Sequence, residues 1–93
     1  MTRPALHLLI EGRVQGVGYR QWFAGEARSL GLTGWVRNRA DGRVEAVVSG
    51  ASDLVERLFA AAQRGPRFAS VSRIERHGIK DDDWPDFSIR PTA

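Results

Sequence analysis

The sequence contains no cysteine and has only short apolar runs, and these two absences exclude several classes of protein. Without cysteine there is no disulfide scaffold, no thiol nucleophile and no thiolate-ligated zinc. No apolar run approaches the roughly 20 residues that a membrane-spanning helix needs. The N-terminal segment also lacks the long apolar stretch and the cleavage site of a secretory signal peptide. We therefore expect a complete cytoplasmic protein that is stabilised by packing alone.

Candidate metal ligands are scarce as well. The two histidines, His7 and His77, lie far apart in the sequence and do not form a spaced ligand pair. Acidic residues gather only at 81–83 and Asp86. Consecutive side chains point in different directions, so we interpret this stretch as a solvated loop rather than a divalent-ion site. The sequence predicts no metal site and no cofactor.

The size and the charge distribution indicate one small domain with a basic half. With 93 residues, 42% of them hydrophobic, the chain can bury one core, and we expect a single domain over residues 1–93. Residues 1–43 carry seven arginines against three acidic residues, whereas residues 44–93 carry seven basic residues against eight acidic ones. Positive charge thus gathers around a glycine-rich segment at 12–20, which favours an anionic ligand.

The hydrophobic pattern predicts an alternation of strands and helices. Apolar residues alternate over 5–12, as in a half-buried strand, and recur every three to four residues over 20–30, as in a helix. The same two patterns predict strands over 33–39 and 43–49, a helix from Ser52 to Gly65, and strands over 71–79 and 87–90. The Asp41-Gly42 pair indicates a hairpin, and Ser52 is a suitable helix cap. The order βαββαβ plus a terminal strand predicts an α+β, ferredoxin-like split fold with two helices on one face of an antiparallel sheet.

The glycine-rich segment reads GRVQGVGYR from Gly12 to Arg20. A Walker phosphate loop requires a lysine, and this segment contains none. The segment also does not fit the dinucleotide-binding pattern, because Gln21 occupies the position of the last glycine. A loop dense in glycine can still turn backbone N–H groups towards an anion, particularly where a helix begins next to it. An ordinary turn between a strand and a helix explains the same glycines. Composition alone leaves both interpretations open.

A second segment, GWVRNRADG, runs from Gly34 to Gly42 along a predicted strand and into its hairpin. Its Asn38 stands close to the turn, and asparagine near a turn is typical of turn chemistry. The residue type and its position therefore do not by themselves identify a functional asparagine.

Together the two segments resemble the signatures of the acylphosphatase family. GRVQGVGYR fits the pattern G-x-V-Q-G-V-x-[aromatic]-R at every specified position. GWVRN, followed by DGRVE and Gly50, resembles the second pattern, which contains G-[aromatic]-V-[basic]-N. The two signatures cover residues 12–50, and the remainder of the chain matches more loosely. Two long motifs in the right order on the right elements make this resemblance specific.

The resemblance implies a set of site residues. Arg20 corresponds to the catalytic arginine and Asn38 to the catalytic asparagine of the family. A phosphate-binding loop, together with Arg20, is implied at Gln15, Gly16, Val17, Gly18 and Tyr19. Tyr19 occupies a position that is often Phe. Trp22 and Arg39 resemble variable positions, where we expect them to tune substrate preference.

The implied reaction is hydrolysis of an acyl phosphate to a carboxylate and inorganic phosphate, by a monomer that binds neither nucleic acid nor membrane. The carboxylate of this mixed anhydride leaves readily, so positioning and charge stabilisation suffice and no metal is expected. Asn38 would orient the attacking water, whose proton passes to a phosphoryl oxygen or to solvent. His7, on the strand face opposite Leu6 and Leu8, is expected to be exposed and structural.

A ferredoxin-like nucleic-acid-binding module is the main alternative. Such modules stack bases on aromatic residues of their central strands, but the third predicted strand, RVEAVVS, has none. We interpret Trp22, Trp35 and Phe59 as core or flanking packing. A binding domain that has kept the fold without the chemistry should have lost Arg20 or Asn38, and both are present.

Overall fold

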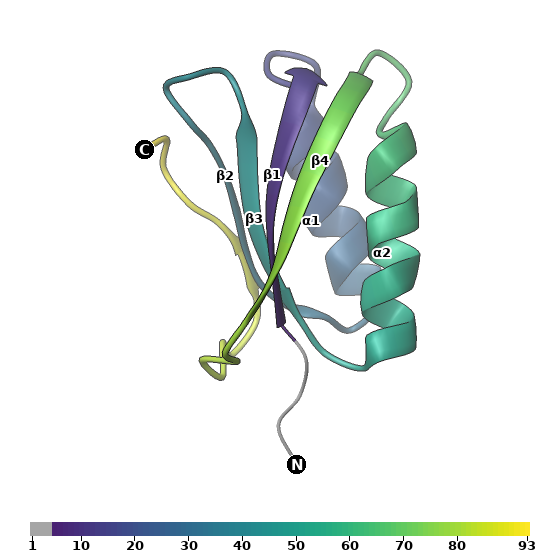
Figure 1. Ribbon diagram of the computed structural model, residues 1–93, viewed down its shortest axis with the longest axis vertical. Coiled ribbons are helices and arrows are strands. Elements are labelled where there is room, and N and C mark those ends of the chain that lie inside the picture. Colours follow the sequence, from purple (N-terminus) through teal and green to yellow (C-terminus); the bar gives the residue numbers. More distant parts are fainter. Residues whose placement is uncertain (1–4) are drawn as a thin grey trace.

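The computed structural model describes residues 5–93, in which five strands and two helices follow one another as the sequence predicts (Figure 1). The elements are β1 (Ala5–Arg13), α1 (Tyr19–Ser29), β2 (Thr33–Asn38), β3 (Val44–Ser49), α2 (Ser52–Arg64), β4 (Ser70–Ile79) and β5 (Phe87–Ile89). The prediction about the N-terminal segment falls partly on residues 1–4, which lie outside the described residues. The described part contains no helix with the length and apolar character that a membrane span requires.

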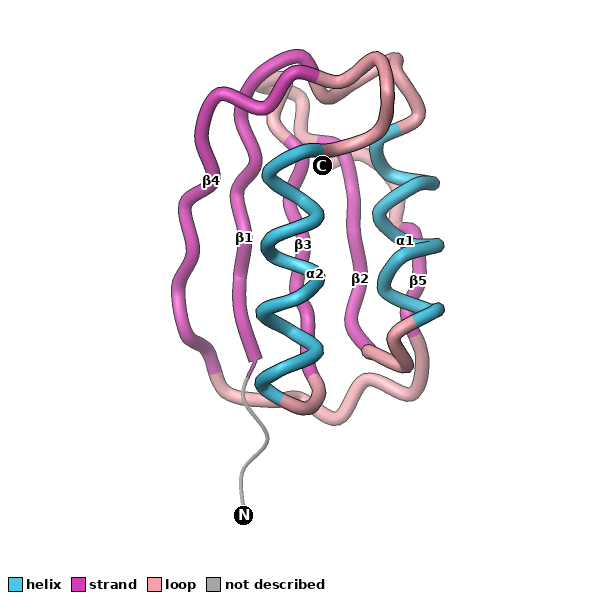
Figure 2. Tube along the Cα trace, turned by 90° about the vertical axis from the view of Figure 1, so that its right-hand side faces the viewer, coloured by secondary structure: helices cyan, strands magenta, loops and turns pink. Residues whose placement is uncertain are grey.

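One sheet with the strand order β4-β1-β3-β2-β5 forms one layer, and the two helices form the other (Figure 2). The helices lie side by side on the same face of the sheet, as predicted for the split βαββαβ fold. The alternation in β1 turns Leu8 and Ile10 towards this face, where they are fully buried. Phe23 and Ala27 of α1, spaced one helical turn apart, are buried against them. The core therefore lies between the helices and the sheet.

The prediction of a purely antiparallel sheet is wrong at one edge. β1, β2, β3 and β4 pair antiparallel, but β5 pairs parallel with β2, with Gly34 opposite Phe87 and Val36 opposite Ile89. The reason is the connection after β4. Residues 80–86 cross one end of the sheet to its far edge, so the chain enters β5 from the end at which β2 begins (Figure 2).

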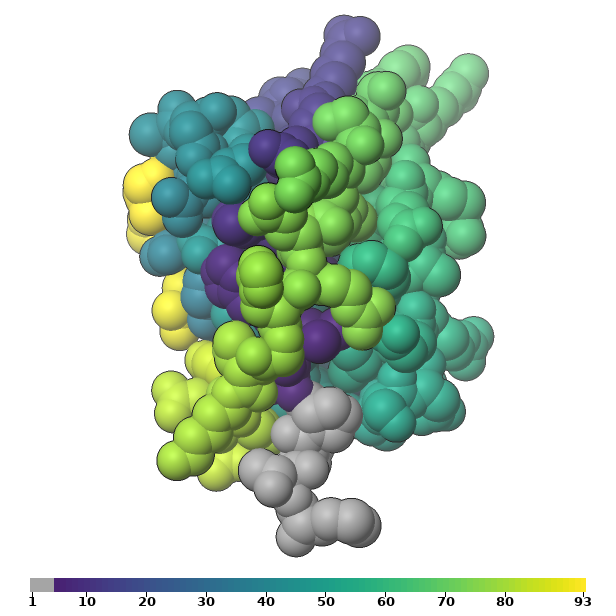
Figure 3. All heavy atoms as spheres, viewed as in Figure 1, coloured from purple at the N-terminus to yellow at the C-terminus, as the bar shows by residue number. Residues whose placement is uncertain are grey.

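The C-terminal residues continue this edge towards the β2–β3 hairpin (Figure 3). The Arg90 N–H donates to the Val36 carbonyl at 2.9 Å, and the Ala93 N–H donates to the Asn38 carbonyl at 3.1 Å. The Ala40 N–H donates in turn to the Ala93 carbonyl at 2.8 Å. The backbone at the end of β2 is thus held from the edge of the sheet as well as by its partner β3.

The helix boundaries differ from the prediction at one cap. Ala51, not Ser52, is the N-cap of α2; Ser52 is its first helical residue, and no side chain within residues 5–93 caps the helix. Asp53 lies in the first turn, as predicted, where its negative charge interacts favourably with the helix dipole. Gly65 ends the helix with a φ of 69°, a conformation that glycine adopts without strain.

Candidate active site

The glycine-rich segment, residues 12–20, covers the end of β1, a loop and the start of α1. β1 continues through Gly12 and Arg13, so the loop proper is shorter than the sequence predicts and covers residues 14–18. Gly16 and Gly18 adopt φ values of 73° and 79°, which side chains with a Cβ rarely adopt. These two glycines let the chain reverse within the loop and enter α1 at Tyr19.

The first turn of α1 offers free hydrogen-bond donors. The helix's first backbone bond runs from the Trp22 N–H to the Gly18 carbonyl at 3.0 Å, so the N–H groups of Tyr19, Arg20 and Gln21 precede the hydrogen-bonded part of the helix. A Ser, Thr or Asp at the N-cap would accept one of these bonds, but the N-cap here is Gly18 and provides no side chain. The first turn also contains no acidic residue. This helix end therefore attracts an anion through both its donors and its dipole.

A pocket of about 190 Å³ opens at this helix end. It is lined by Val14, Gln15, Gly16, Gly18, Tyr19, Arg20, Gln21 and Asn38. The β1–α1 loop and the β2–β3 hairpin lie at the same end of the molecule (Figure 1), so the fold brings two sequence segments together here. The pocket is large enough for a phosphoryl group and a water molecule.

The Arg20 side chain forms no hydrogen bond or ion pair with any other residue in the range 5–93. By contrast, Arg37 and Arg39 on β2 and the following turn both bind Glu45. The guanidinium group of Arg20 is therefore available to bind two oxygens of an anion in the pocket.

Asn38 is the last residue of β2, and its side-chain amide also forms no hydrogen bond with any other residue in the described part of the chain. Strand alternation places it on the same face as Val36, which is buried under the helices. Its Oδ1 atom is buried and accepts no hydrogen bond from residues 5–93. The turn is closed by other groups: the Arg43 N–H donates to Asp41 Oδ1 at 3.0 Å, and the Gly42 N–H donates to the Arg39 carbonyl. The structure thus gives Asn38 no role in turn chemistry.

The family model for acylphosphatases, described as "Acylphosphatase", matches residues 6–89, which is nearly the whole described chain. The chain belongs to the acylphosphatase family. It is 49% identical over 89 residues to an acylphosphatase from Acidiphilium cryptum, with 96% of this chain and 98% of the relative covered. It is 53% identical over 92 residues to an acylphosphatase from Azoarcus sp., with 99% and 94% covered. A solved acylphosphatase structure from Coxiella burnetii superposes with a TM-score of 0.92 at 36% identity, covering 96% of this chain and 94% of that chain.

The protein is therefore an enzyme of this family that hydrolyses acyl phosphates, and the resemblance of its two signatures to those of the family is confirmed. Nothing in the structure or the comparisons favours the nucleic-acid-binding alternative. Trp35 illustrates this point, because it is 7% exposed and the guanidinium groups of Arg37 and Arg90 each lie 4.7 Å from its ring centroid. Its ring faces are covered by the protein itself.

The structure places most, but not all, of the predicted site residues at the pocket. Val17 does not line the pocket; its side chain packs against the hydrophobic core and anchors the loop. Two lining residues were missed by sequence reasoning, Val14 and Gln21. Gln21 could have been found, because it follows Arg20 and shares the open first turn of α1. Val14 is buried and gives no chemical signal in the sequence.

Neither of the two positions expected to tune substrate preference lies at the pocket. The Trp22 ring packs against Tyr19, with ring centroids 5.4 Å apart, and against the core. Arg39 follows the last residue of β2, and its side chain points towards Glu45, away from the pocket. Its guanidinium group binds Asp41 at 3.2 Å and Glu45 at 3.4 Å.

His7 lies on the helix-free face of the sheet and is half-buried rather than exposed. Its Nε2 atom lies 2.6 Å from Glu45 Oε2, while Arg37 donates to Glu45 Oε1 at 2.7 Å. Burial alone would raise the pKa of the Glu45 carboxyl, but the hydrogen bonds from His7 and Arg37 outweigh it and hold the pKa below its usual value. Since the pocket lies on the other face, His7 is not placed to exchange a proton with a ligand there.

Tyr19 connects the start of α1 to the end of α2. Its ring is buried, and its hydroxyl donates to the Ala62 carbonyl at 2.7 Å. In a longer helix that carbonyl would accept a bond from the residue four positions later, but this residue is Pro66, which has no N–H. The Tyr19 hydroxyl takes its place. Burial also raises the pKa of Tyr19 well above its usual value, so the hydroxyl remains a donor.

Replacing Tyr19 by phenylalanine removes this bond and leaves a helix-end carbonyl without a partner. We expect Tyr19→Phe to lower the free energy of unfolding by about 1–2 kcal/mol, the usual cost of leaving a buried acceptor unpaired. Urea denaturation followed by circular dichroism measures the change. An unchanged midpoint would show that water replaces the hydroxyl at no cost.

Proposed function

We propose that the enzyme holds the phosphoryl group of an acyl phosphate between the first turn of α1, the preceding loop and Arg20, while Asn38 orients the attacking water. The observation that carries this proposal is that two unengaged polar side chains from separate segments, Arg20 and Asn38, line one pocket at an uncapped helix end. A polar group that is buried without a partner is costly, and it persists where a ligand supplies the partner.

The phosphoryl oxygens would accept hydrogen bonds from backbone N–H groups at Gly16 to Gln21 and from the Arg20 guanidinium. These groups are fixed before the substrate arrives, so they stabilise the charge on the equatorial oxygens without reorganisation. Loop glycines matter here because Gly16 and Gly18 expose the backbone at φ values that other residues rarely reach.

Asn38 would bind the water through its side-chain amide and hold it in line with the leaving carboxylate. The water oxygen forms a bond to phosphorus as the bond from phosphorus to the acyl oxygen breaks, which gives a carboxylate and inorganic phosphate. An amide does not titrate near neutral pH, so Asn38 is not a general base. We propose that the water proton passes to a phosphoryl oxygen or to solvent.

The proposal includes hydrolysis without a metal ion. The leaving carboxylate is a weak base, so its departure needs no Lewis acid, and Arg20 with the loop amides supplies the positive charge that a metal would otherwise provide. Within residues 5–93, no group of three His, Asp or Glu side chains is arranged to hold a metal ion. Monomeric state and a cytoplasmic location stay predictions of the sequence.

Phosphate release from a simple acyl phosphate such as acetyl phosphate, measured with and without excess EDTA, tests this part of the proposal. We expect the same kcat and KM under both conditions, because every charge-stabilising group is part of the chain. A loss of activity with EDTA that added divalent ions restore would replace this mechanism by a metal-assisted one.

A further inference from the structure

The side chain of Gln15 connects the two segments that form the candidate site, the β1–α1 loop and the β2–β3 hairpin. Its Nε2 atom donates to the Arg39 carbonyl at 2.8 Å and to the Arg43 carbonyl at 2.9 Å. Arg39 and Arg43 are the two ends of the β2–β3 hairpin, and the Arg39 N–H donates to the Arg43 carbonyl at 2.8 Å. A primary amide has two N–H donors, so both are used. The Gln15 amide nitrogen therefore cannot also bind a phosphoryl oxygen.

We propose that Gln15 is a positioning residue, which holds the loop that binds phosphate in register with the asparagine that orients water. Gln15 immediately precedes Gly16 in the loop, and Arg39 immediately follows Asn38. The two hydrogen bonds thus join the direct neighbours of both parts of the site. This inference rests on the roles proposed above for the loop and for Asn38.

The two hydrogen bonds of Gln15 link the β1–α1 loop directly to the β2–β3 hairpin. Within residues 5–93, no other hydrogen bond or ion pair joins residues 14–18 to residues 38–43. The pairing of β1 with β3 ends at Ile10 opposite Val44, before the loop begins. Val14 and Val17 fix the loop in the core on the helix side, so the fold would keep the loop without Gln15. What the loop would lose is its alignment with the hairpin.

Both carbonyls that Gln15 binds also accept a hydrogen bond from a backbone N–H group. The Arg39 carbonyl also accepts the Gly42 N–H at 3.1 Å, and the Arg43 carbonyl also accepts the Arg39 N–H. Removing the Gln15 donors therefore leaves neither acceptor unpaired, and the cost to stability should be small. Catalysis is more sensitive, since a misplacement of about 1 Å between reacting groups can cost about 10²-fold in rate. A positioning role thus predicts a large kinetic effect with a small effect on folding.

Gln15→Met tests this inference, because methionine has a similar length and no donor. We expect kcat for acetyl phosphate to fall about tenfold or more, as expected for lost alignment, while the inhibition constant of inorganic phosphate changes by less than about threefold. Gln63→Met is the matched control, since Gln63 lies exposed on α2 and forms no side-chain hydrogen bond with residues 5–93. It should keep the wild-type kcat. Thermal unfolding of both variants shows that the measured protein is folded.

A double-mutant cycle with Asn38→Ala separates this inference from the proposed function. If Gln15 acts by aligning Asn38, Gln15→Met should lower kcat by less than about twofold in the Asn38→Ala background, because residues that act as a unit are not additive. An equal fall in both backgrounds would overturn the inference and leave the proposed function intact. An unchanged kcat in Asn38→Ala alone would overturn the proposed role of Asn38 itself.

Gln15→Glu provides a second measurement with a pH readout. The introduced carboxylate would place lone pairs against two carbonyl oxygens, so kcat should fall further than in Gln15→Met. Protonation restores one O–H donor, so we expect the ratio of variant to wild-type kcat to rise as the pH falls. A ratio that is independent of pH would contradict the alignment role.

Discussion

Asn38→Ala should lower kcat by about 10²-fold or more, the loss expected when a positioned reactant is released, while inorganic phosphate still inhibits at nearly its wild-type concentration. The groups proposed to bind phosphate lie on the loop and α1, and Asn38 reaches the pocket from β2. Removing its amide therefore affects the water and not the phosphoryl oxygens. Steady-state hydrolysis of acetyl phosphate with phosphate as a competitive inhibitor measures both quantities.

The stability of the same variant provides its control. Asn38 Oδ1 is buried without a partner in the described residues, so its removal breaks no hydrogen bond within them and eliminates a desolvated acceptor. We expect the free energy of unfolding to stay within about 1 kcal/mol of the wild-type value, since only the packing of a small side chain is lost. Full turnover in Asn38→Ala would refute the water-orienting role. A fall in kcat that accompanies a large loss of stability would indicate a structural role instead.

The order of elements could be predicted because its signals are local. The spacing of Phe23 and Ala27, the Asp41-Gly42 turn and Gly65 at the end of α2 are each determined by a few neighbouring residues. The parallel pairing of β5 could not be predicted. This strand has three residues, too few to carry a pattern, and its place depends on where residues 80–86 cross the sheet.

The pocket was predictable from the two signatures, but the side-chain contacts around it were not. The signature includes Gln15 in the phosphate-binding loop, but it does not indicate that the Gln15 side chain binds backbone carbonyls of the hairpin, since carbonyls carry no sequence signal. Nor does it indicate that the Val17 side chain packs against the core. The bond from Tyr19 to α2 depends on Pro66, far along the chain. Such contacts link segments that only the folded chain brings together.

Arg20→Ala should damage both binding and turnover, and this distinguishes it from Asn38→Ala. Among residues 5–93, the guanidinium group of Arg20 is the one positively charged side chain that lines the pocket. We expect the inhibition constant of inorganic phosphate to rise, and kcat to fall by about 10³-fold, because charge-stabilising arginines contribute 10³- to 10⁵-fold in phosphoryl transfer. Arg20→Lys should recover little of either, since an ammonium group cannot bind two oxygens in the planar geometry of the fork.

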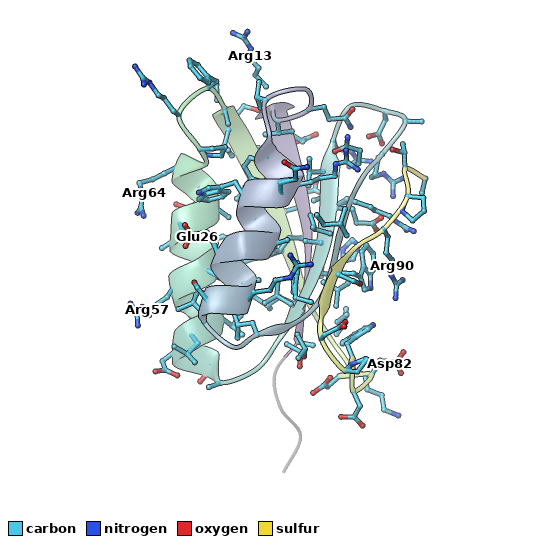
Figure 4. All side chains as sticks on the ribbon, turned by 180° about the vertical axis from the view of Figure 1, so that it is seen from behind. Arg13, Glu26, Arg57, Arg64, Asp82 and Arg90 are labelled. Atoms are coloured by element: carbon cyan, nitrogen blue, oxygen red, sulfur yellow. The ribbon has the colours of Figure 1, made fainter. Side chains whose placement is uncertain are left out.

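A loss of stability would not explain a fall in kcat and weaker phosphate binding in Arg20→Ala, because of where Arg20 lies in α1. A positive charge in the first turn of a helix opposes the helix dipole, and no acidic residue lies in that turn to offset it. Removing it should therefore leave the unfolding midpoint unchanged or slightly raised. Arg57→Ala is the matched control, because Arg57 also lies on a helix without an ion pair in the described residues and points into solvent (Figure 4). If Arg57→Ala kept wild-type kinetics and Arg20→Ala did as well, the phosphoryl group would have to be held by the backbone amides alone.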